Sequence, residues 1–184
     1  TIGAFIWVFL RQPQRFTRWR NVLAFTTAFA IVGFSLFPLM PPRLLNDGGP
    51  YGGRELSQAA IAEGRLDPGD VDFVDTLAVH GGLWSFDSGA MKEISNQYAA
   101  MPSLHTAWAV WSALVMWPLV RRRWAKALLV AYPLLTVYCI VVTANHFWLD
   151  GVGGLVGLTA GYLAGSALDD WNNRRLARRR ATLA

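Results

Sequence analysis

Long apolar runs, interrupted by short clusters of arginine, constrain the fold of this chain more than any other feature. Hydrophobic residues make up 53% of the 184 residues and charged residues only 16%, a balance that is unusual for a soluble domain. Because about 20 apolar residues in a helix cross the hydrocarbon core of a membrane, the runs predict transmembrane helices. We expect four full spans, at residues 21–40, 103–120, 127–143 and 149–168.

Residues 1–10 are also apolar, but a helix of this length reaches only about half of the hydrocarbon core. We expect them to be the last part of a spanning helix whose first part lies outside the sequence. A cleaved signal peptide is the alternative, but its charged first region and its small-residue cleavage site are absent. The predicted fold is therefore an all-α, polytopic membrane helix bundle with four full spans and one partial N-terminal span. Residues 1–184 form one membrane-embedded domain, expected to be truncated at its N-terminus.

The basic residues predict the orientation of the bundle. Thirteen of the 17 lysine and arginine residues fall in three clusters, within residues 11–20, 121–126 and 174–180. The predicted spans place all three clusters on one side of the membrane, and the positive-inside rule assigns that side to the cytoplasm. We therefore expect an integral plasma-membrane protein. Because the basic residues mark helix ends, the net charge of +5 does not indicate a nucleic-acid partner.

Residues 44–98 form the only long polar segment, with nine acidic residues against three basic ones. The predicted topology makes this segment an extracytoplasmic loop within the domain. Glycines and prolines mark turns in it, and short helices are expected between them at residues 54–63 and 71–79.

The last predicted span is rich in glycine. Small residues spaced four apart let two helix backbones approach closely in a membrane. The pairs Gly153–Gly157 and Gly157–Gly161 therefore predict a tight contact between this span and a neighbour.

Two histidines fall near the outer ends of the predicted spans. His105 follows Pro102 and Ser103, where a helix is expected to begin, and a helix start offers free N–H groups to an anion. His146 and Asp150 are expected to share one helix face, with the carboxylate holding the imidazole. Ionisable residues in membrane segments are costly and indicate function. Two histidines at one depth suit phosphoryl transfer, in which one imidazole attacks phosphorus and the other protonates the leaving oxygen.

Three segments of the chain resemble the motifs of a known family. Met-Pro-Ser-Leu-His at 101–105, His146-xxx-Asp150 and Pro-Arg at 42–43 look like those of the type 2 phosphatidic acid phosphatase superfamily. Members are integral-membrane lipid-phosphate phosphatases and phosphotransferases, and the resemblance covers residues 41 to about 165. It implies a phosphohistidine intermediate on His146, oriented by Asp150, with His105 as acid and base at the outer membrane face. It implies no metal and no cofactor.

The sequence departs from the usual family motifs at four positions. Leu104 stands in place of a glycine and Leu44 in place of a proline, while Leu36 and Ile140 stand where the family carries a lysine and an arginine. The pattern instead resembles the branch that includes inositol-phosphorylceramide synthases. Asn-Gln-Tyr at 96–98 and Thr-Ala-Asn at 143–145 fit that branch.

Because two phosphate-binding cations of the family are missing, Arg43 is the strongest remaining candidate for a phosphate ligand. The implied substrate is a lipid phosphate or pyrophosphate, and the implied acceptor is water, a polyol or a lipid hydroxyl, with membrane lipids as the surrounding partners. Further candidate substrate ligands are Ser103 and Asn145 and, more weakly, the loop residues Lys92 and Arg54.

Each residue also has an alternative without catalysis. His105 could bond to the backbone at the interface, His146 with Asp150 could join helices as a buried polar pair, and Arg43 could anchor the interface. Two facing histidines could also bind haem or a metal ion. The rival function is a transport or assembly protein of the membrane that kept the bundle and lost the chemistry.

Overall fold

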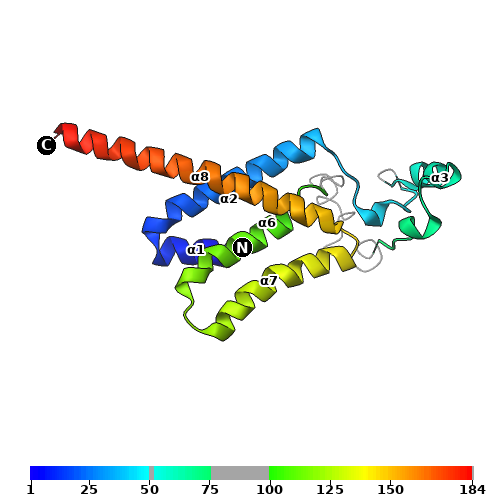
Figure 1. Ribbon diagram of the computed structural model, residues 1–184, viewed down its shortest axis with the longest axis horizontal. Coiled ribbons are helices and arrows are strands. Elements are labelled where there is room, and N and C mark those ends of the chain that lie inside the picture. The colour runs from blue at the N-terminus through cyan, green and yellow to red at the C-terminus, as the bar shows by residue number, and fades with distance from the viewer. Residues whose placement is uncertain (50–51, 76–99, 184) are drawn as a thin grey trace.

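The computed structural model describes residues 1–49, 52–75 and 100–183 (Figure 1). The described residues contain helices and no β-strand, which confirms the all-α fold. The α-helices are α1 (Ile2–Arg11), α2 (Pro13–Leu36), α3 (Arg54–Ala62), α6 (Leu104–Met116), α7 (Arg123–Val142) and α8 (Trp148–Leu183). Short 3-10 helices are η1 (Pro42–Leu44), η2 (Pro68–Val71) and η4 (Trp117–Leu119).

Three of the helices, α2, α7 and α8, are long and apolar enough to cross a membrane. The predicted span at 103–120 forms a shorter α-helix, α6, of 13 residues, which rises about 20 Å. Its α-helical part ends where Pro118 cannot donate the next backbone hydrogen bond, and the chain continues as the 3-10 turn η4. The chain therefore has the predicted run of helices, while the count of four full spans stays a prediction.

Helices α2 and α8 both extend further at their basic ends than the hydropathy of the sequence predicts. Helix α2 begins at Pro13, because proline suits the first position of a helix, and it includes Arg15, Arg18 and Arg20 of the first cluster. Helix α8 continues through the arginine-rich tail and reaches 36 residues, or about 54 Å. No glycine or proline follows Gly165, and the tail is built mainly of good helix formers.

Helices α2 and α8 run antiparallel and make the closest contact of the bundle. A Cβ atom added at Gly165 would lie 2.5 Å from the Val22 nitrogen, and one added at Gly161 would lie 2.2 Å from the Thr26 hydroxyl. Only glycine permits this approach. The predicted tight contact of this span is present, and Gly161 of the predicted pairs takes part in it. Gly157 faces open space, and the second glycine of the contact with α2 is Gly165.

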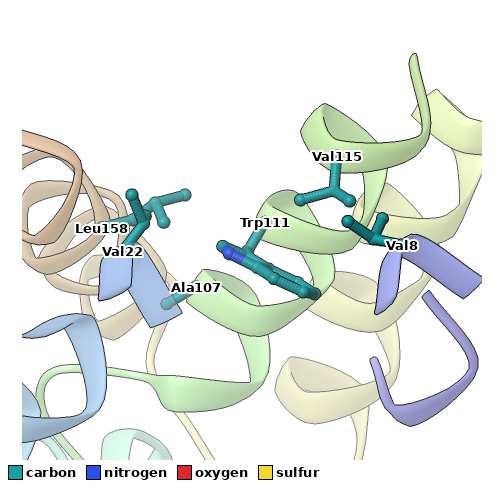
Figure 2. Close-up of a cluster of buried hydrophobic side chains, with 6 residues drawn as sticks. All are labelled: Val8, Val22, Ala107, Trp111, Val115 and Leu158. Carbon is teal, nitrogen blue, oxygen red and sulfur yellow. The ribbon is translucent and has the colours of Figure 1, made fainter. Parts of the chain in front are cut away.

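The apolar core lies where α1, α2, α6 and α8 meet, around the fully buried Trp111 of α6 (Figure 2). The indole N–H of Trp111 donates to the Trp19 carbonyl at 3.1 Å, so the ring is buried without an unsatisfied donor. Val8 of α1 packs beside Val115, which places α1 against the C-terminal half of α6. The other members of this cluster are Val22, Ala107 and Leu158.

Helix α7 packs on the side of α6, and most of its surface is exposed. Ile140 is its one buried residue in the described structure, whereas its exposed positions after Arg123 are mainly apolar. Exposure of such a large apolar surface is unfavourable in water and is typical of a helix that faces lipid. The helix also continues without a break through Pro133.

The alternating helix directions bring the three basic clusters to one end of the bundle (Figure 1). Arg18 of the first cluster forms ion pairs with Asp169, at 3.4 Å, and with Asp170, at the start of the basic tail. The common end is thus as predicted, while its assignment to the cytoplasm stays a prediction.

At the opposite end lies the described part of the polar segment, with η1, α3 and η2 (Figure 1). The short helix predicted at residues 54–63 is present as α3, and the Ser57 hydroxyl donates to the Leu45 carbonyl at 2.9 Å to hold it. The helix predicted at 71–79 is wrong for the residues described. Val71 ends the 3-10 turn η2, which Pro68 begins, and residues 72–75 are irregular, while 76–79 lie outside the described ranges.

Gly161→Ala should destabilise the bundle, because the added methyl group would overlap Thr26 at a contact that only glycine permits. Overpacking of this kind costs about 1–3 kcal/mol. The matched control is Gly157→Ala, one turn away on α8, where an added Cβ has no atom within 4 Å. Thermal unfolding in detergent should give a lower Tm for Gly161→Ala and an unchanged or higher Tm for Gly157→Ala. Equal Tm values for the two variants would contradict the close contact between α2 and α8.

Candidate active site

The start of α6 is held by a serine cap. Ser103 is fully buried and extended, and its hydroxyl accepts the Thr106 N–H at 3.4 Å. Its own N–H donates to the Asp150 carbonyl at 2.9 Å, which ties the start of α6 to the start of α8. The candidate substrate ligand Ser103 therefore has a structural role in the described geometry, and its contact with a substrate stays a prediction.

His105 and His146 meet at the junction of these two helix starts. His105 Nδ1 lies 3.3 Å from His146 Nε2, and the ring centroids are 5.5 Å apart at an interplanar angle of 67°. His146 is buried with 5% of its surface exposed, whereas His105 is exposed. One imidazole is thus held in place, and the other has access to solvent.

Asp150 orients His146 from the first turn of α8. The carboxylate oxygen Oδ2 lies 3.2 Å from His146 Nδ1 and also accepts the Phe147 N–H at 2.9 Å. The contact between histidine and aspartate is as predicted, but the predicted reason was wrong. Helix α8 begins at Trp148, so His146 lies in the turn before the helix, and Asp150 reaches back to close that turn.

The turn that carries His146 follows the end of α7. Ala144 has a left-handed backbone with φ of 54°. This conformation costs a residue that has a side chain about 1–2 kcal/mol. The Asn145 and His146 N–H groups both donate to the Ile140 carbonyl, at 3.0 and 3.1 Å. This turn reverses the chain after α7 and places His146 next to the first turn of α6.

Arg43 reaches the same junction from η1. Its backbone N–H donates to the Ala144 carbonyl at 2.9 Å, and its side chain is buried with 6% exposed. The guanidinium group forms an ion pair with Asp75, in which Nη1 and Oδ2 are 2.6 Å apart. Asp75 was not among the sequence candidates, because nothing in the sequence distinguishes it from the eight other acidic residues of the polar segment.

The remaining candidates contribute less to this junction. The Asn145 side-chain amide donates to the Thr143 hydroxyl at 2.8 Å, and the Arg54 side chain donates to the Asn46 carbonyl at 3.0 Å. Lys92 and residues 96–98 lie outside the described ranges. Of the His, Cys, Asp and Glu side chains in those ranges, no group of three is arranged to bind a metal ion.

A comparison with known families identifies the chain. The family model described as the PAP2 superfamily matches residues 1–164, which include Arg43 and both histidines. The chain belongs to the PAP2 superfamily. No curated protein and no solved structure matched it.

Membership of the PAP2 superfamily agrees with the helices that are long enough to cross a membrane, and it supports a membrane protein of the phosphatase type. The superfamily generally comprises phosphatases and phosphotransferases. The match does not distinguish a branch within it. At the two positions where the usual motifs carry cations, Leu36 is exposed at the end of α2 and Ile140 is buried in α7.

The contacts of the two rings favour one arrangement of their protons. An ionised Asp150 only accepts, so His146 Nδ1 must be the protonated nitrogen when its imidazole is neutral. The unprotonated His146 Nε2 then carries the lone pair, and it faces His105 Nδ1. A hydrogen bond between the rings requires His105 Nδ1 to donate.

Nitrogen-15 NMR of the two imidazoles should therefore show the neutral form of His146 protonated at Nδ1 and unprotonated at Nε2, because Asp150 stabilises that tautomer. In Asp150→Asn, the amide can donate to the ring and should shift the proton toward Nε2. The control is His80→Asn, which identifies the signal of the third histidine of the chain. An Nε2-protonated His146 in the unmodified protein would contradict the arrangement.

Proposed function

We propose that this member of the PAP2 superfamily transfers a phosphoryl or phospho-headgroup from a lipid phosphate or pyrophosphate through a phosphohistidine on His146. The observation that supports the proposal is the position of His146 Nε2. Its ring is held from behind by Asp150 at Nδ1, and Nε2 faces His105 Nδ1 at 3.3 Å. His146 therefore contacts an orienting carboxylate through one ring nitrogen and the proposed acid through the other, as a nucleophile of this kind requires.

In the first step, the His146 Nε2 lone pair attacks phosphorus while the bond from phosphorus to the leaving oxygen breaks. His105 gives its proton to that oxygen. In the second step, His105 takes a proton from water or from an acceptor hydroxyl, whose oxygen attacks phosphorus. The bond between phosphorus and Nε2 then breaks, which returns His146 to its first state.

The substrate must enter between the two rings, because nitrogen atoms 3.3 Å apart leave no space for a phosphoryl group. His146 is buried and is bonded to Asp150, whereas His105 is exposed on the first turn of α6. His105 is therefore the ring that moves aside. An exposed ring also suits an acid that must recover its proton from solvent.

Arg43 is the proposed ligand for the phosphate oxygens, because η1 holds it beside the turn that carries His146. The start of α6 adds partial positive charge, which stabilises anions. Asn145, Ser103 and Lys92 are proposed as further substrate ligands. Asp75 keeps the Arg43 guanidinium in place and partly balances its charge.

The acceptor distinguishes a phosphatase from a phosphotransferase. The resemblance to inositol-phosphorylceramide synthases favours a polyol or lipid hydroxyl as acceptor in place of water. The second candidate is a non-catalytic membrane protein of the same fold. The observation that favours it is the pair of apolar residues, Leu36 and Ile140, at the two cation positions, because developing negative charge needs stabilisation.

His146→Ala should abolish turnover of a lipid phosphate, because the covalent route is lost. His105→Ala should slow turnover by about 10²–10⁴-fold and should still form the adduct from a substrate with a good leaving group. Asp150→Asn should fall between the two, since the amide favours the wrong tautomer. The measurement is turnover of radiolabelled lipid phosphates, with and without a polyol acceptor, and the count of acid-labile label on the protein.

Equal label on wild type and His146→Ala would exclude His146 as the nucleophile. No turnover of any lipid phosphate by the folded wild type would favour the non-catalytic candidate. Arg43→Gln should raise KM, while Arg65→Gln serves as a matched control, because the Arg65 side chain is exposed and pairs with Glu63. Orthovanadate, which resembles pentacoordinate phosphorus, should inhibit the active protein.

The active site is proposed to face the outside of the plasma membrane, because the basic clusters lie at the other end of the bundle. The test uses single cysteines in a Cys139→Ala background, since Cys139 is exposed. In intact cells, an impermeant thiol reagent should label Glu63→Cys, after α3, and should not label Arg122→Cys, before α7. Labelling of Arg122→Cys alone would reverse the orientation.

A further inference from the structure

A cavity of about 520 Å³ lies at the basic end of the bundle, away from the two histidines. It is formed between the first turns of α2 and the part of α8 that extends beyond the predicted span. Its wall is polar and basic, with side chains from Gln14, Thr17, Asn172, Asn173, Arg175 and Arg179. The proposed chemistry uses none of these residues.

Tryptophans with cations above their rings show the depth of this cavity in the membrane. The Arg175 guanidinium carbon, in the cavity wall, lies 5.2 Å from the centre of the Trp171 ring. Two further pairs at the same end of the bundle are Arg11 over Trp7, at 5.4 Å, and Lys126 over Trp117, at 4.8 Å. Trp and basic residues gather at the membrane interface, so the cavity opens at the level of the lipid headgroups.

The charge in the cavity favours an anion. Arg175 and Arg179 are four residues apart on α8, so they lie on one helix face, and within the described residues neither forms an ion pair. Asp169 also lines the cavity, but Arg18 pairs with it at 3.4 Å. Two guanidinium groups therefore remain to balance a phosphate, which Arg binds through several N–H groups at once.

The uncharged residues favour a lipid over a free anion. The amides of Asn172, Asn173 and Gln14 supply donors and acceptors for headgroup hydroxyls. Leu176, with 52% of its surface exposed, borders the same cavity and offers an apolar contact to an acyl chain. A zwitterionic headgroup would bring its own cation toward two arginines, which is unfavourable.

From these observations we infer that the cavity between α2 and α8 is a binding site for a phospholipid with an anionic, hydroxyl-bearing headgroup. The lipid comes from the leaflet at the basic end, its phosphate lies between Arg175 and Arg179, and its acyl chains lie along the lipid-facing surface beside Leu176. The site binds the lipid at the end of the bundle opposite His105 and His146, so it does not depend on the proposed reaction.

The test is titration of the purified protein with phosphatidylglycerol, read by native mass spectrometry and by the rise in Tm. The double variant Arg175→Gln/Arg179→Gln should bind this lipid at least about tenfold more weakly, since each basic side chain near a lipid surface contributes about fivefold. The matched control is Arg178→Gln/Arg180→Gln, which removes the same charge from the same helix outside the cavity. Gel filtration establishes that both variants remain folded.

Tight binding of phosphatidylglycerol to wild type and to the control, with loss in the cavity variant, supports the site. Equal weakening in both variants would show an unspecific effect of charge and would overturn the proposal. Equal retention of phosphatidylcholine would overturn the selectivity for an anion. Glycerol 3-phosphate, which lacks acyl chains, should give no rise in Tm, and a rise equal to that with phosphatidylglycerol would make the ligand a soluble phosphate instead.

Discussion

The candidate active site depends on the contacts of one residue, Asp150. Its carboxylate holds His146 Nδ1 at 3.2 Å and accepts the Phe147 N–H at 2.9 Å, and its carbonyl accepts the Ser103 N–H at 2.9 Å. Asp150 thereby fixes the imidazole, closes the turn into α8 and holds the helix start that carries His105. Because the carboxylate is 3% exposed, its removal leaves two donors without their acceptor. The packing of the helix starts and the geometry of the site are thus inseparable.

Local sequence patterns predicted the site more reliably than they predicted how the helices pack. The motifs around His105 and His146 predicted a meeting of two histidines, and hydropathy predicted the helices, because both signals lie within short stretches of sequence. The glycine contact was only partly located, since spacing alone does not show which turns of α8 meet α2, and the contact involves Gly161 and Gly165 but not Gly157. Likewise, the ion pair of Arg43 with Asp75 joins residues 32 positions apart and has no local signal.

The two ends of the bundle differ in chemistry because the helices alternate in direction. The end with His105 and His146 carries the acidic polar segment, from which Asp75 pairs with Arg43 beside the candidate site. The other end has arginines and tryptophans at the level of the headgroups. Helix α8 joins both, since it begins near His146 and continues past the cavity that contains Arg175. One uninterrupted helix therefore connects two polar sites across the apolar middle of the protein.

The ion pair of Arg43 with Asp75 has a consequence for how an anion arrives. If Arg43 receives the substrate phosphate as proposed, the protein already supplies a counterion of its own at that position. Binding is then an exchange of one anion for another, in which Asp75 loses a partner as the phosphate gains one. The affinity for the headgroup then reflects the difference in free energy between the contact of Arg43 with the phosphate and its contact with the Asp75 carboxylate. Such a site discriminates between anions by their geometry more than by their charge.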